Sequence, residues 1–265
     1  MSQKSVKPTQ LRRTSSSILG ANAWCAAIAL AVLTCIVLLW SNPIMGQVTG
    51  HSKPPQQRVE WAYPTNYGER LSQDIYGTPL RNPFIVVIHE TVGSATSAVN
   101  TFQTPNYSSQ GDQVSYHALI ALDGTIIYTV PFQYRAFGAG NSVFVGSNGP
   151  ESVQSSPRVP ASVNNCAYHF SLETPVDGRH NGDGHSGYTA NQYQSLAWLV
   201  RYTRVPDARI TYHKTIDRSG TRRDPRSFDQ NYFFQTLHSQ QAARQPSLDA
   251  PLLVAAVHPR LRVVN

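Results

Sequence analysis

The chain has 265 residues, of which 40% are hydrophobic and 14% are charged, and it contains three cysteines. This composition excludes an intrinsically disordered chain, a disulfide framework and a four-cysteine zinc site. The formal net charge is +7. Such a charge is compatible with binding to nucleic acid or to an anionic membrane, so the positions of the basic residues decide what it means.

The start of the chain explains much of this charge. Residues 1–17 hold four Lys or Arg residues and no acidic residue, and residues 18–40 form an uncharged, largely apolar run. A run of this length can cross a bilayer as one helix, and the positive charge before it places residues 1–17 in the cytoplasm. We therefore predict a transmembrane anchor or signal segment at 18–40, with export of the remainder to the periplasm or cell envelope. A buried core helix is the alternative, and the lack of a clean Ala-x-Ala site after the run favours an anchor.

Three further regions follow the apolar run. Residues 41–60 are rich in Pro, Gln, Ser and Gly and lack an apolar period, which is typical of a linker. Strand and helix signals then alternate, which predicts one α/β domain at 61–240. Residues 241–265 match no element and form a C-terminal tail.

Strand signals are clearest in the first half of the domain. Residues 84–88 (FIVVI) form a continuous apolar run, as expected for a strand that is buried on both faces. Residues 115–120 and 125–130 flank Asp123-Gly124, a strong hairpin signal. Two further strands are predicted at 167–172 and 210–212.

Two helices are predicted in the second half. Thr189 and Gln192 have the spacing of a capping box, and apolar residues recur at helical spacing after them, which predicts a helix over 189–202. Ser227 and Gln230 repeat the spacing and predict the start of a second helix.

Several common functional motifs are missing from the sequence. It contains no dinucleotide-binding fingerprint, no phosphate-binding P-loop and no Gly-x-Ser-x-Gly nucleophile elbow. His89-Glu90 starts like a zincin motif, but the position of the second histidine is Gly93. Beyond residue 40 the chain holds 18 basic against 15 acidic residues, so we expect no nucleic-acid partner.

Two histidines stand where strands are predicted to end, and an aspartate follows in a loop. His89 follows the strand at 84–88, His213 follows the strand at 210–212, and Asp224 lies in an arginine-rich loop further on. Two histidines and one carboxylate can hold a tetrahedral zinc ion with its fourth position open to water. The spacing alone is a weak signal, because a histidine at a strand end is more often a hydrogen-bonded structural residue.

Five stretches, taken in this order, resemble the zinc-dependent N-acetylmuramoyl-L-alanine amidases of the amidase-2 type. That family shares its fold with T7-type lysozymes and peptidoglycan recognition proteins. The resemblance covers roughly residues 80–235 and implies an α/β fold with a central mixed β-sheet flanked by helices. The stretches are IVVIH at 85–89, SYHALI with DGTI at 115–126, RAFGAGN at 135–141, FSLE at 170–173, and the segment from His213 to Asp224-Pro225.

The resemblance also implies a reaction. It is hydrolysis of the amide between N-acetylmuramic acid and L-alanine of peptidoglycan, or of a released muropeptide, by a zinc-bound water during cell-wall turnover or remodelling. The enzyme would act as a monomer with Zn²⁺ as its cofactor. The implied zinc ligands are His89, His213 and Asp224, the implied general base is Glu173, and the implied residues beside the oxyanion are Tyr116 and Arg222.

The sequence departs from the family pattern at two places. The family's Trp-His is Phe137-Gly138 here, which removes a histidine that could contact substrate near the metal. Arg222 stands where the family has lysine, and its planar guanidinium has a different reach. A peptidoglycan-binding module without catalysis on the same fold is therefore the alternative function. His117 is expected to be structural, and His169 is expected to be a core residue or to support the ligands from behind.

Overall fold

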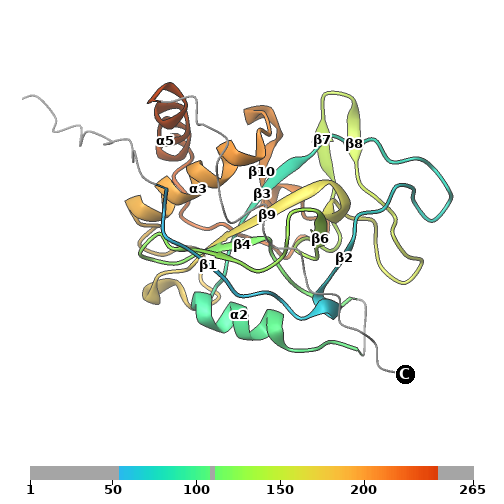
Figure 1. Cartoon of the computed structure of the whole chain (residues 1–265), viewed down its shortest axis with the longest axis horizontal. Helices are drawn as coiled ribbons and strands as arrows, with labels where there is room; N and C mark the ends of the chain where they lie inside the picture. The colour runs from blue at the N-terminus through green and yellow to red at the C-terminus, as the bar shows by residue number, and fades with distance from the viewer. Residues whose placement is uncertain (1–53, 108–110, 244–265) are drawn as a thin grey trace, which may run out of the picture. The chain divides into compact units, whose positions relative to one another are not determined.

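The computed structural model describes residues 54–107 and 111–243. Within them, six strands form a mixed sheet in the order β1-β5-β4-β9-β3-β10 (Figure 1). Strands β4 and β5 are antiparallel, and the other neighbouring strands are parallel. The strands are β1 (Gln57–Val59), β3 (Ile85–Glu90), β4 (Ala118–Ile120), β5 (Ile126–Tyr128), β9 (Ala167–Leu172) and β10 (Ile210–Tyr212).

Helices cover both faces of this sheet. Helices α3 (Ala190–Thr203) and α5 (Gln230–Ala243) lie on one face, where their apolar residues pack with Val86 and Ile88 of β3. Helix α2 (Ala95–Gln103) lies on the opposite face (Figure 1). Because side chains alternate along a strand, His89 points to the face opposite α3 and α5. The sequence's prediction of a mixed sheet flanked by helices is confirmed.

Short elements complete the fold. Two antiparallel ribbons are formed by β2 (Tyr67–Glu69) with β6 (Tyr134–Ala136), and by β7 (Phe144–Gly146) with β8 (Gly149–Glu151). The short helical turns are η1 (Pro64–Asn66), η2 (Asn164–Cys166), η3 (Val176–Gly178), η4 (Asp207–Arg209) and α4 (His213–Ile216).

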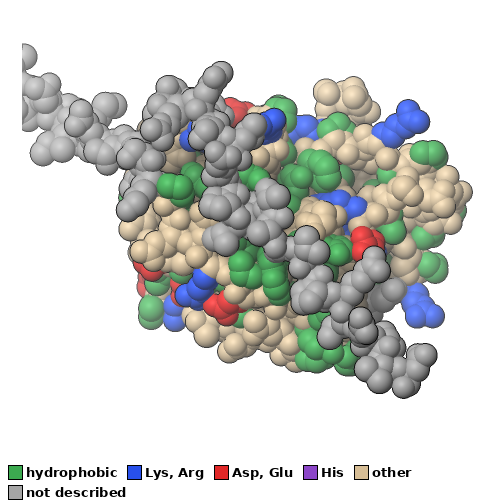
Figure 2. Space-filling view, viewed as in Figure 1, with side chains coloured by type: hydrophobic (Ala, Val, Ile, Leu, Met, Phe, Trp, Pro, Cys, Tyr) green, Lys and Arg blue, Asp and Glu red, His purple; other side chains and the backbone are tan. Residues whose placement is uncertain are grey.

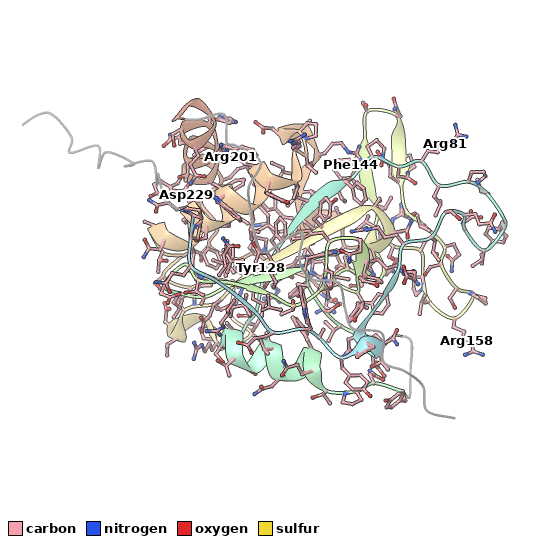
Figure 3. The ribbon with its side chains drawn as sticks, viewed as in Figure 1. Arg81, Tyr128, Phe144, Arg158, Arg201 and Asp229 are labelled. Carbon is pink, nitrogen blue, oxygen red and sulfur yellow. The ribbon has the colours of Figure 1, made fainter. Side chains whose placement is uncertain are left out.

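Charged side chains lie mainly at the surface. Figure 2 shows basic and acidic residues interspersed on the visible face, rather than in one continuous basic area of the kind that binds nucleic acid. Arg81 and Arg158 point outward at the periphery, whereas Tyr128 lies within the sheet (Figure 3).

The predicted hairpin is confirmed. Strands β4 and β5 pair on either side of Asp123-Gly124, and the Thr125 backbone N–H donates to Asp123 Oδ1 at 2.8 Å. Gly124 has a φ of +89°, a conformation that glycine adopts without steric cost. A Cβ at this position would also lie 2.9 Å from the Cβ of Asn191. The absence of a side chain therefore allows the turn to approach α3 closely.

One of the two predicted helix caps is wrong. The capping box of Thr189 and Gln192 is present at the start of α3. Ser227, in contrast, has a φ of +50° and accepts a hydrogen bond from the His185 backbone N–H instead of capping α5. Asp229 takes the capping role, because its carboxylate accepts from the Tyr232 backbone N–H at 2.9 Å.

The predicted boundaries at both ends need correction where the structure describes them. Strand β1 lies inside the segment 41–60, because its backbone pairs with β5 and makes it part of the sheet instead of a linker. Helix α5 continues to residue 243, past the predicted start of the tail at 241. The predicted membrane segment at 18–40 lies outside the described residues. Among the helices that are described, none is both long and apolar enough to cross a bilayer.

Candidate metal centre

The three predicted metal ligands come together on one side of the sheet. His89 is the fifth residue of β3, and His213 directly follows β10, the parallel neighbour of β3. Asp224 approaches from the loop after α4, where its backbone carbonyl accepts from the Lys214 N–H at 2.9 Å. All three ligand residues are buried.

Their ligand atoms face one another. His89 Nδ1 and His213 Nδ1 are 3.1 Å apart, and Asp224 Oδ2 lies 3.3 Å from the first and 3.1 Å from the second. Two imidazole nitrogens and a carboxylate oxygen are a donor set that zinc prefers. These separations match the edges of a tetrahedron with metal–ligand bonds of about 2.0–2.1 Å. The residues present therefore fit a zinc ion.

The surroundings favour the protonation states that a metal needs. Burial lowers the pKa of His89 to about 4, although Asp224 partly opposes the shift. Burial alone would raise the pKa of Asp224, but the hydrogen bonds from His213 and His89 lower it well below its usual range. The result is a neutral imidazole beside an ionised carboxylate, both of which can donate a lone pair to a metal.

A third histidine contacts the ligand group from behind. His169 Nδ1 lies 2.9 Å from His89 Nε2, the ring nitrogen that faces away from His213. The backbone N–H of His169 donates to His117 Nδ1 at 3.0 Å. Burial holds the pKa of His169 well below its usual value, so its ring is neutral. His169 thus contacts the ligand His89 directly, and His117 contacts His169.

Tyr116 and Arg222 lie near the ligands. The Tyr116 ring stacks on His89 with a centroid distance of 4.4 Å. Burial raises the pKa of Tyr116 above its ordinary value, so the phenol stays protonated and can donate a hydrogen bond. Arg222 is exposed, and its positive charge contributes to lowering the pKa of both His89 and Tyr116. The guanidinium is therefore within electrostatic reach of the ligand group.

Glu173 has different neighbours from the other predicted site residues. Its Oε1 accepts from Arg179 Nη2 at 3.1 Å, and its Oε2 accepts from the Leu122 backbone N–H at 3.1 Å. The residue paired with His89 across the sheet is Ser171, two positions earlier. The Ser171 hydroxyl is buried and has no hydrogen-bond partner among the described residues.

A buried ion pair between residues adjacent in sequence to the ligands was missed by the sequence reasoning. The carboxylate of Glu90, whose side chain is 1% exposed, accepts from Arg226 Nε. It also accepts from Tyr188 Oη at 2.8 Å and lies 3.0 Å from His185 Nε2. Glu90 follows His89 directly in the sequence, but nothing in the local pattern pairs it with Arg226.

The same arginine fixes the loop at residues 178–182. Arg226 donates to the backbone carbonyls of Gly178, His180 and Gly182 over 2.6 to 2.8 Å. The guanidinium therefore uses all three of its nitrogens, one on Glu90 and two on the loop. Through Arg226, the loop is therefore tied to Glu90 at the end of β3.

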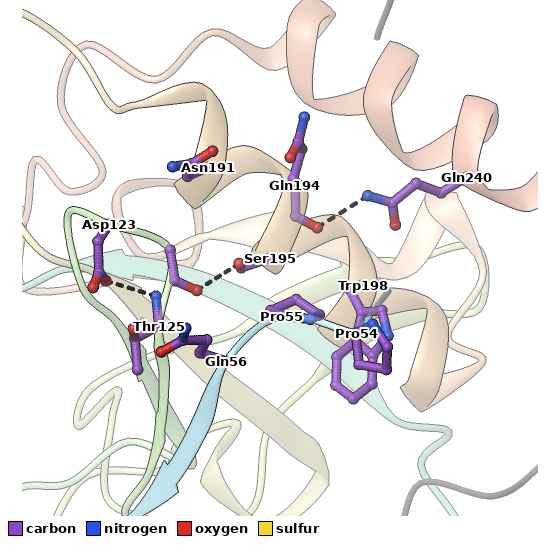
Figure 4. Close-up of a pocket in the computed structure, with 11 residues that line it drawn as sticks. Pro54, Pro55, Gln56, Asp123, Thr125, Asn191, Gln194, Ser195, Trp198 and Gln240 are labelled. Atoms are coloured by element: carbon purple, nitrogen blue, oxygen red, sulfur yellow. Dashed lines mark hydrogen bonds between the residues drawn. The ribbon is translucent and has the colours of Figure 1, made fainter. Parts of the chain in front are cut away.

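The described part of the chain also contains a cavity of about 350 Å³ away from these residues. It lies between the Asp123–Thr125 turn, the start of α3 and the end of α5 (Figure 4). Ser195 Oγ donates to the Gly124 carbonyl at 2.6 Å, and Gln240 Nε2 donates to the Gln194 carbonyl at 3.1 Å. Its lining includes no predicted ligand or catalytic residue, so this cavity is separate from the metal centre.

Several solved structures resemble this chain. A selenomethionine derivative of AmpD has a TM-score of 0.47 at 24% identity, over 71% of this chain and 97% of that one. AmpD from Citrobacter freundii has a TM-score of 0.42 at 22% identity, over 73% and 95%. The N-acetylmuramoyl-L-alanine amidase LysC from Clostridium intestinale URNW has a TM-score of 0.43 at 20% identity, over 69% and 98%. No curated protein sequence matches this chain significantly.

The sequence of the chain shows its family, whereas the three structures, with TM-scores below 0.5, do not. The profile described as N-acetylmuramoyl-L-alanine amidase matches residues 79–227, which is more than half of the chain. The matched region contains all three residues of the metal centre. The chain therefore belongs to the N-acetylmuramoyl-L-alanine amidase family, amidase-2 type.

Proposed function

We propose that this member of the amidase family is a zinc-dependent enzyme that cleaves the bond between N-acetylmuramic acid and L-alanine. As an N-acetylmuramoyl-L-alanine amidase it acts on peptidoglycan. The observation that carries the metal dependence is the buried group of His89, His213 and Asp224. Intact peptidoglycan and released muropeptides both contain the amide.

Each ligand would offer one atom to the zinc ion. His89 and His213 offer Nδ1, and Asp224 offers a carboxylate oxygen. When bound in such a site, zinc polarises the substrate carbonyl and lowers the pKa of water to about 7. The ionised carboxylate of Asp224 and the neutral ring of His89 carry no excess proton that the ion would have to displace.

The remaining residues would handle the proton and the developing charge. Glu173 is the proposed general base, which takes a proton from the attacking water at a carboxylate oxygen and passes it to the leaving amine nitrogen. The carbonyl oxygen becomes negative as the water attacks. The Tyr116 hydroxyl and the Arg222 guanidinium are the proposed groups that stabilise this charge, by hydrogen bonding and by electrostatic attraction.

We place the reaction outside the cytoplasm. This proposal rests on the uncharged run at 18–40 and on the basic residues before it, which together suit an anchor or a signal segment. The protein would act as a monomer in the periplasm or cell envelope, where its substrate lies.

The direct test is stem-peptide release from purified peptidoglycan by the full-length chain in detergent. Release should stop when a chelator removes the metal and return when zinc is added. His213→Ala should abolish release, whereas His238→Ala should not, because His238 is exposed and pairs with Asp207. Zinc binding and peptidoglycan binding without release would instead support the non-catalytic module. Release that survives complete metal removal would contradict the proposal.

A further inference from the structure

We propose that His169 is a positioning residue for the metal ligand His89, and that residue 138 is glycine because the His169 ring fills the space of a side chain there. The proposal rests on the proposed zinc site. It concerns a contact behind that site rather than the ligand set itself.

Metal binding by His89 would set the direction of the hydrogen bond between the two rings. His89 Nδ1 faces His213 and Asp224, so its lone pair must be free if it is to bind a metal. A neutral imidazole has one proton, which must then reside on Nε2. That nitrogen lies 2.9 Å from His169 Nδ1, which accepts the bond when His89 is in this tautomer. His169 thereby selects the tautomer of His89 and the orientation of its ring.

The accepting ring is held in place from several sides. His169 lies in β9, where it pairs in register with Val87 of β3. Its backbone N–H donates to His117 Nδ1, and the two rings are nearly parallel, with an interplanar angle of 8° and centroids 5.9 Å apart. The whole residue is buried. An acceptor fixed in the central sheet can therefore fix the ligand that it bonds.

Gly138 leaves the room that this ring needs. A Cβ at residue 138 would lie 2.5 Å from His169 Nδ1 and 2.6 Å from its Cγ, which is shorter than real Cβ contacts. Gly138 does not have a positive φ, so the requirement is for space and not for backbone freedom. The departure at residue 138 thus has a physical reason, because an imidazole from β9 occupies the volume that a side chain there would take.

The matched variants for a test are His169→Asn and His169→Leu. Asn Oδ1 can stand where Nδ1 accepts, whereas Leu has a similar branch point without an acceptor. Zinc affinity of the full-length chain is measured by competition with a chelator. We expect His169→Leu to raise the Kd about 10- to 100-fold and His169→Asn to stay within about threefold of wild type. Equal affinity in all three proteins would overturn the positioning role and leave the proposed zinc amidase intact. A wild-type chain without zinc would instead overturn the proposed function, and this inference with it.

A glycine pair gives an independent test should His169→Leu fail to fold. Gly138→Ala should weaken zinc binding, whereas Gly140→Ala should not, because a Cβ at residue 140 meets no atom within 4 Å. In a His169→Ala background Gly138→Ala should cause no further loss, because the ring that it displaces is gone. The melting temperature of each metal-free variant separates folding from metal binding. Additive effects of the two substitutions would contradict the proposal.

Discussion

Glu90 and Arg226 form a buried ion pair between segments that lie 136 residues apart. Their side chains are 1% and 4% exposed. Glu90 directly follows the ligand His89, and Arg226 stands two residues after the ligand Asp224. The pair therefore joins the segment that carries the ligand His89 to the segment that carries the ligand Asp224.

Loss of this arginine should destabilise the fold strongly. Arg226→Leu leaves the Glu90 carboxylate buried without its cation, which typically costs about 3–5 kcal/mol in the free energy of unfolding. The matched control is Arg223→Leu, which removes an exposed arginine paired with Asp183 and should cost no more than about 1 kcal/mol. Urea unfolding of the metal-free proteins measures both values. Similar small losses in the two variants would contradict a structural role for the buried pair.

The proposed base can be separated from the proposed ligands. Glu173→Gln should lower kcat by about 10²- to 10⁴-fold, because the amide cannot take the proton. Zinc content should stay at the wild-type level, since Glu173 contacts Arg179 and Leu122 instead of the ligands. The control is Glu69→Gln, at an exposed position in β2. An unchanged kcat for Glu173→Gln would remove Glu173 from the mechanism.

Adjacent arginines provide a test of charge stabilisation. Arg222→Ala should reduce kcat/KM by about 10²- to 10³-fold, as expected when a group that stabilises the oxyanion is lost. Arg223→Ala should have little effect, because its side chain pairs with Asp183. Arg222→Lys should recover much of the activity by restoring the charge. Equal activity losses for the two alanine variants would point to overall charge rather than to a placed guanidinium.

The metal-free protein should lose stability as the pH falls below about 6.5. Burial lowers the pKa of His89 to about 4 and that of His117 to about 3, from 6.5 in both cases. Above pH 6.5 both rings are neutral whether the chain is folded or unfolded. Below pH 6.5 the two histidines bind protons in the unfolded chain but not in the native state. The stability that is present above pH 6.5 is therefore lost progressively as the pH falls to 3–4.

Unfolding free energies of the metal-free chain at pH 7.5 and 5.5 measure this loss. His117→Asn should reduce the difference between the two pH values, because one of the buried imidazoles is then absent. Constant stability across this range would show that the histidines do not resist protonation in the folded state.

Much of the fold was predictable because the relevant signals are local. The strands at 167–172 and 210–212 have the predicted bounds, and the capping box of Thr189 marks the start of α3. Helix α2 was not predicted from the sequence, although Ser94 caps it and both Val99 and Phe102 lie on its buried face. Strands of three residues such as β1 are too short for a clear apolar period, and their pairing with distant strands defines them.

The candidate site shows the same division. His89 and His213 were predictable because the first lies near the end of a recognisable strand, the second directly follows one, and both stand in a family-like order of motifs. Contacts between segments that are distant in the sequence were not predictable. The space at Gly138 depends on the ring of His169 in another strand, and no spacing in the sequence indicates that contact. Glu173 was placed by resemblance, and its hydrogen bonds to Arg179 and Leu122 became visible only in the structure.

Zinc content of the full-length chain, with and without His213, tests the metal centre most directly. The wild-type protein should retain one tightly bound zinc ion per chain after dialysis. His213→Ala should lose it, because only His89 and Asp224 of the three ligands would remain. Stoichiometric, tightly bound zinc in His213→Ala, or none in the wild-type protein, would contradict the ligand set.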